Sequence, residues 1–255
     1  MGFHEGSVLF WSLPCRRHRD VPSGLEQEQT QSNSFDGCKL NTPGQEPFVR
    51  STGHQPKTCD QKIIEGIVTT VSEDGSVNIA PMGPRADLDF DTLLFRPYKT
   101  SATYRNLTRT KQGVFHITDD VELFARAAVS RMEAVPKLIP AREVEGHILA
   151  DACRWFAFRV VDVRDEDEPA QMRAAVVDRG TLRDFFGFNR AKHAVVEAAI
   201  LATRLTQLPA ARIDAELDCL AGPVAKTGGA QERRAFAFLN DYVRSARDMR
   251  GRPEV

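Results

Sequence analysis

Residues 63–84 alternate apolar side chains with Thr, Ser and Asn, a pattern typical of β-strands. Asp74-Gly75 divides the stretch into two halves, and glycine supplies the positive φ that a two-residue hairpin turn needs. The second half runs into residues 80–84 (APMGP), where two prolines and a glycine end strand pairing. The pattern therefore predicts a β-hairpin whose second strand ends with backbone N–H and C=O groups open to a flat ligand. An ordinary first hairpin of a β-barrel explains the same residues.

Shorter β-rich runs follow the hairpin, at residues 86–95, 112–118, 147–165 and 171–177. The strongest, residues 154–163, is largely apolar on both faces, so we expect it to be covered on both sides. Two short helices fall between the runs. Thr100 or Ser101 caps the first, which ends near Thr108, and Asp119-Asp120 caps the second, over residues 121–130. Five or six strands with two short helices predict a small barrel.

After Thr181 the spacing of apolar residues along the chain changes from the alternation of strands to the spacing of helices. Residues 189–208, 211–220 and 231–249 have helical spacing, and Gly222-Pro223 is expected to end the second of these helices. The predicted fold class is α+β, mainly β, with a barrel over residues 61–178 and a helical C-terminal subdomain over 179–255. Residues 1–60 are polar and turn-prone without a sustained period, which predicts a disordered or adventitious N-terminal extension.

The charge, the apolar runs and the cysteines of the chain limit the kinds of binding partner and compartment that we expect. The formal net charge is -1, so nothing in the balance calls for nucleic acid or an anionic membrane. No apolar run approaches the ~18–20 residues of a membrane span. The five cysteines are odd in number, widely spaced and without a C-x-x-C pair. They suit a reducing cytoplasm and argue against a disulfide framework or a zinc site.

Candidate chemistry is concentrated in residues 99–106 (KTSATYRN), directly after a predicted strand. This segment places hydroxyl groups and two cations at a helix N-terminus. Helix N-termini offer unpaired N–H groups and a favourable dipole to phosphate, and Lys and Arg add charge-assisted bonds. The segment therefore predicts a phosphate-binding turn. A capped surface helix with incidental charges is the alternative.

Three segments together resemble a known fold family: the hairpin ending in NIAPMGP, the strand followed by KTSATYRNL, and the strand FHITDD. They are similar to the flavin-reductase-like FMN-binding split barrel. The chain resembles more closely the DUF447 family within that fold, to whose helical motif NRAKHAVVEAAILATR is similar. The resemblance covers about residues 63–248. It implies an FMN-binding flavoprotein that is a homodimer, with the flavin at the dimer interface.

The resemblance also implies site residues. The flavin ring would pack against the strand 78–83, and the phosphate would lie around residues 99–106. The expected ring neighbours are Asn78, Ala80, Pro81 and Met82. The expected phosphate neighbours are Thr100, Ser101, Thr103 and Asn106, with Lys99 and Arg96. His116, on the next strand, would meet the ring or the ribityl chain; a core histidine bonded to a carbonyl is the alternative.

A second constellation lies on the predicted helix 189–208. Arg190, His193, Glu197 and Arg204 are spaced to share one helix face, beside a separate alanine-rich stripe. A row of polar residues is commonly a solvated face. The family resemblance offers another interpretation, in which this face closes over the flavin pocket and Arg190 and His193 contact an anionic substrate or the cofactor phosphate.

No G-x-G-x-x-G, G-x-S-x-G, P-loop or paired metal-ligand spacing occurs. In flavoenzymes the flavin carries the electron chemistry, which explains why no catalytic dyad is apparent. The expected activity is that of an FMN-dependent oxidoreductase passing electrons from NADH or NADPH to an unidentified small acceptor. Two alternatives stay open. One is a flavin-binding protein without turnover, acting as sensor, carrier or assembly partner. The other is a split barrel with a deazaflavin, pyridoxal phosphate or haem.

Overall fold

The computed structural model describes residues 61–250, so the expectation for residues 1–60 lies outside the described part of the chain. Eight strands form one antiparallel sheet in the order β1-β4-β5-β10-β9-β6-β2-β3, and a separate two-stranded sheet pairs β7 with β8. The strands are β1 (Lys62–Ile63), β2 (Gly66–Val71), β3 (Val77–Met82), β4 (Arg85–Ala86), β5 (Thr92–Phe95), β6 (Gln112–Ile117), β7 (Leu138–Pro140), β8 (His147–Leu149), β9 (Arg154–Arg164) and β10 (Gln171–Thr181).

The predicted hairpin is present as β2 and β3, but its turn differs from the expected two-residue form. Val71 pairs with Val77, and the N–H of Ser72 donates to the carbonyl of Ser76 at 2.8 Å. Three residues therefore form the loop, ending on Gly75 with φ 81°. A three-residue loop of this kind commonly combines a type I turn with a left-handed residue, which explains why glycine occupies the third position.

The barrel core is aromatic. Phe95, Phe115, Phe156 and Phe158 are fully buried, and the rings of Phe95 and Phe158 lie 4.6 Å apart between centroids. Burying each such ring contributes roughly 1.5–3 kcal/mol. The outer face of β9 is not covered as expected, because Arg159 and Val161 are exposed.

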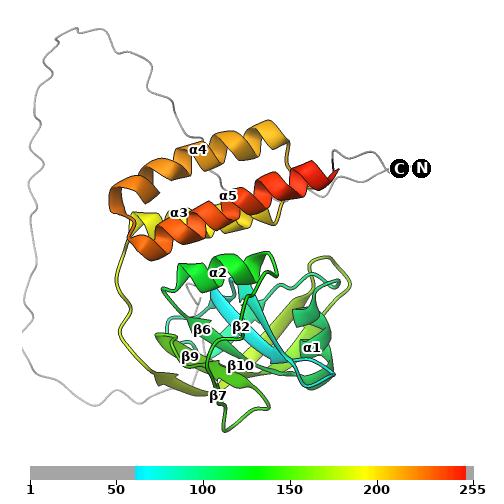
Figure 1. Cartoon of the computed structure of the whole chain (residues 1–255). Helices are drawn as coiled ribbons and strands as arrows, with labels where there is room; N and C mark the ends of the chain where they lie inside the picture. Colours follow the sequence, from blue (N-terminus) through cyan, green and yellow to red (C-terminus); the bar gives the residue numbers. More distant parts are fainter. Residues whose placement is uncertain (1–60, 251–255) are drawn as a thin grey trace, which may run out of the picture. The chain divides into compact units, whose positions relative to one another are not determined.

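Five helices complete the described chain: α1 (Ala102–Thr110), α2 (Val121–Ala128), α3 (Arg190–Ala202), α4 (Ala210–Thr227) and α5 (Ala230–Arg250). α2 contacts β3 on one side and α3 and α5 on the other (Figure 1). Phe124 of α2, Val195 of α3 and Leu239 of α5 share one apolar core with Ile67 of β2. The barrel and the C-terminal helices thus belong to one unit, and β10 extends beyond the expected boundary at residue 178.

The expectation that Gly222-Pro223 ends the second C-terminal helix is wrong. α4 continues through both residues to Thr227. Proline removes one backbone hydrogen bond from a helix interior, at a cost of about 3 kcal/mol. Val224 follows directly and is buried against Ala191 and Ala194 of α3, so tertiary packing offsets the local preference.

No helix in residues 61–250 is long and apolar enough to cross a membrane. Cys153 is free and buried. The expectation that the five cysteines form no disulfide framework involves residues outside the described part of the chain and stays a prediction.

Candidate functional site

β3 lies at the edge of the eight-stranded sheet, so β2 is its only neighbour there. All six of its residues are half-buried. Its two faces meet different surroundings: Met82 packs against the barrel core, and Ile79 packs against the helical core. An edge strand leaves alternate N–H and C=O groups outside the ladder. Within residues 61–250 the backbone of β3 makes no hydrogen bond beyond that ladder, which leaves these groups open to a ligand.

The start of α1 has the features of an anion site. Ser101 is the N-cap, and its Oγ accepts a hydrogen bond from the N–H of Tyr104 at 3.1 Å and donates to the carbonyl of Tyr98 at 2.7 Å. The N–H groups of Ala102 and Thr103 find no acceptor among the described residues. No acidic residue occupies the first turn. The dipole and the unpaired N–H groups therefore favour a bound anion.

A chain of hydrogen bonds joins β3 to α1. The side-chain amide of Asn78 donates to Oγ1 of Thr103 at 3.1 Å and to Oγ1 of Thr70 at 3.2 Å. The amide of Asn106 donates to the same Thr70 oxygen at 3.0 Å. Thr103 and Asn106 are buried, so the structure brings the predicted ring strand and phosphate helix together but turns the Thr103 side chain to Asn78 of β3 and the Asn106 side chain to Thr70 of β2.

The expected cations flank the start of α1. The side chains of Arg96 and Lys99 are half-buried and form no ion pair with another described residue. Thr100 is exposed, and its carbonyl accepts from the guanidinium of Arg105 at 2.7 Å. These residues keep positive charge and one exposed hydroxyl beside the unpaired N–H groups of α1.

An acidic loop touches the same turn. Glu168 Oε1 accepts a hydrogen bond from the backbone N–H of Lys99 at 2.9 Å. The Tyr104 hydroxyl donates to Asp165 Oδ2 at 3.0 Å, and this bond raises the pKa of Tyr104. The sequence of the run from Asp165 to Glu168 predicts a turn whose charges are solvated. Its side chains are exposed, but they also hold the loop against the start of α1, which no sequence signal indicated.

His116 belongs to the core. It is fully buried, its Nδ1 lies 3.1 Å from the carbonyl oxygen of Ile67, and its Nε2 accepts from the N–H of Leu149 at 3.1 Å. These partners put the proton on Nδ1. Burial lowers the pKa of His116 from 6.5 to about 4, although the bond to Ile67 opposes the shift. Of the two interpretations of His116, the structure therefore shows the core histidine bonded to a carbonyl.

The polar face of α3 lies near the end of β3. Burial, and then the nearby carboxylate of Glu197, raise the pKa of Glu65. Glu65 in turn covers Gly83, where an added Cβ would lie 2.8 Å from its Oε1. The side chains of Arg190 and His193 are exposed and form no hydrogen bond or ion pair within residues 61–250, although the His193 ring lies 6.1 Å from that of Phe188.

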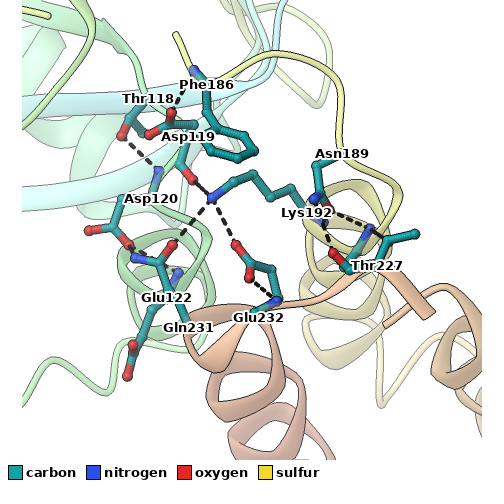
Figure 2. Close-up of polar contacts among 12 residues, drawn as sticks. Thr118, Asp119, Asp120, Glu122, Phe186, Asn189, Lys192, Thr227, Gln231 and Glu232 are labelled. Carbon is teal, nitrogen blue, oxygen red and sulfur yellow. Dashed lines mark hydrogen bonds and ion pairs between the residues drawn. The ribbon is translucent and has the colours of Figure 1, made fainter. Parts of the chain in front are cut away.

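Lys192 fixes the start of α3 to the barrel (Figure 2). Its Nζ lies 2.9 Å from Glu232 Oε1 and donates to the carbonyl of Asp119 at 2.7 Å and to Gln231 Oε1 at 3.3 Å. The Lys192 and Glu232 side chains are largely buried. The bonds connect the β6–α2 turn with α3 and α5, so they set how the polar face of α3 stands beside the barrel.

Asp119 anchors the segment that leads from β10 into α3. Both of its carboxylate oxygens accept from the guanidinium of Arg183, and Oδ2 also accepts from the N–H of Phe186 at 2.9 Å. The bonds from Arg183 lower the pKa of Asp119. Asn189 then caps α3 by accepting from the N–H of Ala191 at 2.8 Å. The second acidic residue of the FHITDD segment, Asp120, caps α2 as expected.

Within residues 61–250 no three His, Cys, Asp or Glu side chains lie close enough to hold a metal ion. The arrangement offers an open strand edge on one side and an anion-binding helix terminus on the other. Such a pair of features suits a flat ligand that carries a phosphate.

Comparison with known proteins identifies the family and the fold of the chain. The model of the N-terminal domain of the family "Protein of unknown function (DUF447)" matches residues 64–183, and that of its C-terminal domain matches residues 189–241. An FMN-bound protein of the same family from Methanosarcina mazei is 23% identical, with a TM-score of 0.60, over 72% of this chain and 96% of that chain. No curated protein matches the sequence.

Two further structures are similar over about half of this chain. The styrene monooxygenase flavin reductase of Pseudomonas putida is 16% identical, with a TM-score of 0.40, over 48% of this chain and 82% of that chain. The flavoredoxin of Desulfovibrio vulgaris is 14% identical, with a TM-score of 0.39, over 52% of this chain and 76% of that chain. The predicted fold class, an α+β split barrel of the FMN-binding type, is confirmed. With both domain models matched along the described residues, the chain belongs to the DUF447 family.

Proposed function

We propose that this chain binds FMN, with the flavin ring along the edge of β3 and the phosphate at the start of α1. The observation that carries the proposal is the hydrogen bond between Asn78 and Thr103, which joins the open strand edge to the unpaired N–H groups of the helix. The FMN found in the Methanosarcina mazei protein supports the same ligand class.

The residues around the helix terminus fit a phosphate. Ser101 and Thr100 supply hydroxyl groups, and Lys99 and Arg96 supply positive charge that no described carboxylate neutralises in an ion pair. The N–H groups of the first turn add donors directed along the helix axis. Thr103 and Asn106 support this turn from the buried side and do not contact the ligand in the proposal.

The residues of β3 fit a flat ring. Ala80, Pro81 and Met82 are half-buried and apolar, and their side chains alternate between the two faces of the strand, so the ring would lie along the strand edge and not on one face of the sheet. The backbone groups outside the ladder would hydrogen-bond the polar edge of the ring system, with Pro81 offering only its carbonyl. The polar face of α3, with Arg190 and His193, would close the site beyond Gly83 and meet an anionic part of a second substrate.

The proposed activity is that of an oxidoreductase. FMN, when bound, would supply the capacity for hydride and electron transfer between NADH or NADPH and a small acceptor. The chain's own residues bind and orient the ring, and they hold the phosphate so that the ring stays at the strand edge. No described side chain needs to form a covalent bond in this scheme.

We also propose that the chain functions as a homodimer in the cytoplasm. The segment between β10 and α3 exposes Leu182, Phe185, Phe186 and Phe188, of which Phe188 is 97% exposed. A monomer rarely leaves so many large apolar side chains together in water, because their burial against a partner is favourable. A second copy is the occupant that the family resemblance implies.

An absorbance spectrum of the purified protein tests flavin binding. We expect yellow protein that releases FMN on heating, and anaerobic bleaching of its visible band by NADH or NADPH. Colourless protein that takes up no added FMN would refute the proposal. Bound flavin that neither nicotinamide reduces would instead identify a flavin-binding protein without this activity.

A single substitution tests the assignment of the phosphate site to the start of α1. Thr100→Ala removes an exposed hydroxyl from the turn without touching the N-cap Ser101, and a hydrogen bond to a charged group contributes about 1.5–3 kcal/mol, so we expect FMN to bind on the order of 10-fold more weakly or worse. Riboflavin, which has no phosphate, should bind the variant and the wild type alike. Ser245→Ala, at an exposed position of α5, serves as the control.

A further inference from the structure

Thr70 stands at the centre of the hydrogen bonds that join the two halves of the proposed site. It lies on β2 and is fully buried. Its Oγ1 accepts from the amide of Asn78 on β3 at 3.2 Å and from the amide of Asn106 on α1 at 3.0 Å. One hydroxyl oxygen therefore links the ring strand to the phosphate helix, although no ligand on the surface touches it.

We infer that Thr70 is a positioning residue that sets the spacing between the open edge of β3 and the start of α1. The inference rests on the proposed function, because the spacing matters only for a ligand that reaches both ends. FMN has such a shape, whereas riboflavin lacks the phosphate and engages the strand edge alone. Thr70 thus contributes to the preference for FMN over riboflavin without contacting either.

The physical reason lies in the coupling of two contact regions. A ligand held at both ends gains affinity from the second contact only if the protein's two contact regions are the right distance apart once the first contact has formed. Loss of the Thr70 oxygen removes the acceptor that the amides of Asn78 and Asn106 share. The start of α1 is then held to β3 only by the bond between Asn78 and Thr103. Its later turns keep the bonds from Asn106 to Ser72 and from Arg109 to Val71, which do not reach β3. A misplacement of about 1 Å reduces the effect of a positioned group by up to about 100-fold.

The test compares FMN with riboflavin in the full-length protein. Thr70→Val removes the hydroxyl at nearly constant volume, and Thr70→Ser keeps it. We expect the ratio of the riboflavin Kd to the FMN Kd to fall on the order of 10-fold in Thr70→Val. In Thr70→Ser the ratio should stay within about twofold of the wild-type value, and the riboflavin Kd should change little in either variant.

Thr69→Val is the matched control. Thr69 is the neighbouring residue, is equally buried, and donates its hydroxyl to the carbonyl of His147 at 2.5 Å. This variant loses a buried hydrogen bond of the same kind, but within residues 61–250 the Thr69 side chain makes no hydrogen bond to β3 or α1, so we expect the ratio to be unchanged. If Thr70→Val does not fold, Asn106→Ala removes the α1 side of the same link and should lower the ratio in the same way.

The outcomes separate this inference from the proposed function. A wild-type protein that prefers FMN, with a ratio that survives both Thr70→Val and Asn106→Ala, overturns the role of Thr70 alone. A ratio that falls equally in Thr69→Val would show general destabilisation and also overturns it. A wild-type protein that binds FMN no better than riboflavin overturns both the phosphate assignment and the inference.

Discussion

Acidification from pH 7 to pH 5 tests the role of His116 as a neutral core histidine. Burial lowers its pKa from 6.5 to about 4 in the folded chain. Between these values the unfolded chain binds a proton at this imidazole and the folded chain does not. The free energy of unfolding therefore falls as the pH is lowered, because protons stabilise the state that binds more of them.

The magnitude follows from the two pKa values. At about 1.36 kcal/mol per pH unit, the interval from 6.5 to about 4 amounts to roughly 3 kcal/mol, and about 2 kcal/mol of this is lost between pH 7 and pH 5. The contribution is complete above pH 6.5 and disappears as the pH approaches the folded-state pKa. Both ring nitrogens of His116 are hydrogen-bonded, so the imidazole keeps this buried position in the folded chain, where burial lowers its pKa.

Urea denaturation of the wild type and of His116→Asn at several pH values is the assay. The variant lacks the titrating group, so its disadvantage at pH 7 should shrink by about 2 kcal/mol at pH 5. Ser245→Ala, at an exposed position of α5, should give a curve parallel to the wild type. Parallel curves for wild type and His116→Asn, separated by a constant amount from pH 7 to pH 5, would refute the neutral core histidine.

Three further predictions follow from named contacts. Lys192→Met leaves Glu232 buried without its cation, so urea denaturation should show a free energy of unfolding lower by about 3–5 kcal/mol. Adding Glu232→Leu removes the unpaired carboxylate and should restore much of this loss. Glu168→Gln removes a negative charge beside the start of α1, so titration should give an FMN Kd lower by about two- to fivefold, with the riboflavin Kd unchanged. Phe188→Asp should convert a dimer to a monomer by light scattering, whereas Leu88→Asp, equally a change at an exposed apolar residue, should not.

The strands and helices of the barrel follow from sequence because their local patterns are strong. Alternation located β2 and β3, and Ser101 capped α1 where hydroxyl residues after a strand predicted a helix start. Pro223 shows the limit of such rules. Its effect on α4 depends on Val224 packing against α3, a contact that no local pattern reveals.

The candidate site was predictable in part. Segment motifs located the edge strand and the helix terminus, because each has a recognisable composition. They did not reveal that Thr103 and Asn106 turn inward, since this depends on the register that places Thr70 opposite Asn78. Thr69 and Thr70 are alike in sequence, and only the pleat of β2 assigns one to His147 and the other to α1. The contact between Glu168 and Lys99 joins residues far apart in the chain and left no sequence signal.

Titration of the full-length protein with FMN and with riboflavin, followed by flavin fluorescence, tests the central claim most directly. The claim predicts saturable binding of one FMN per chain. Riboflavin should bind more weakly by on the order of 10-fold, because it lacks the phosphate and therefore the charge-assisted hydrogen bonds that the phosphate makes. Equal affinity for the two flavins would contradict the phosphate site at the start of α1. Absence of binding by either flavin would contradict the flavin site at the edge of β3 as well.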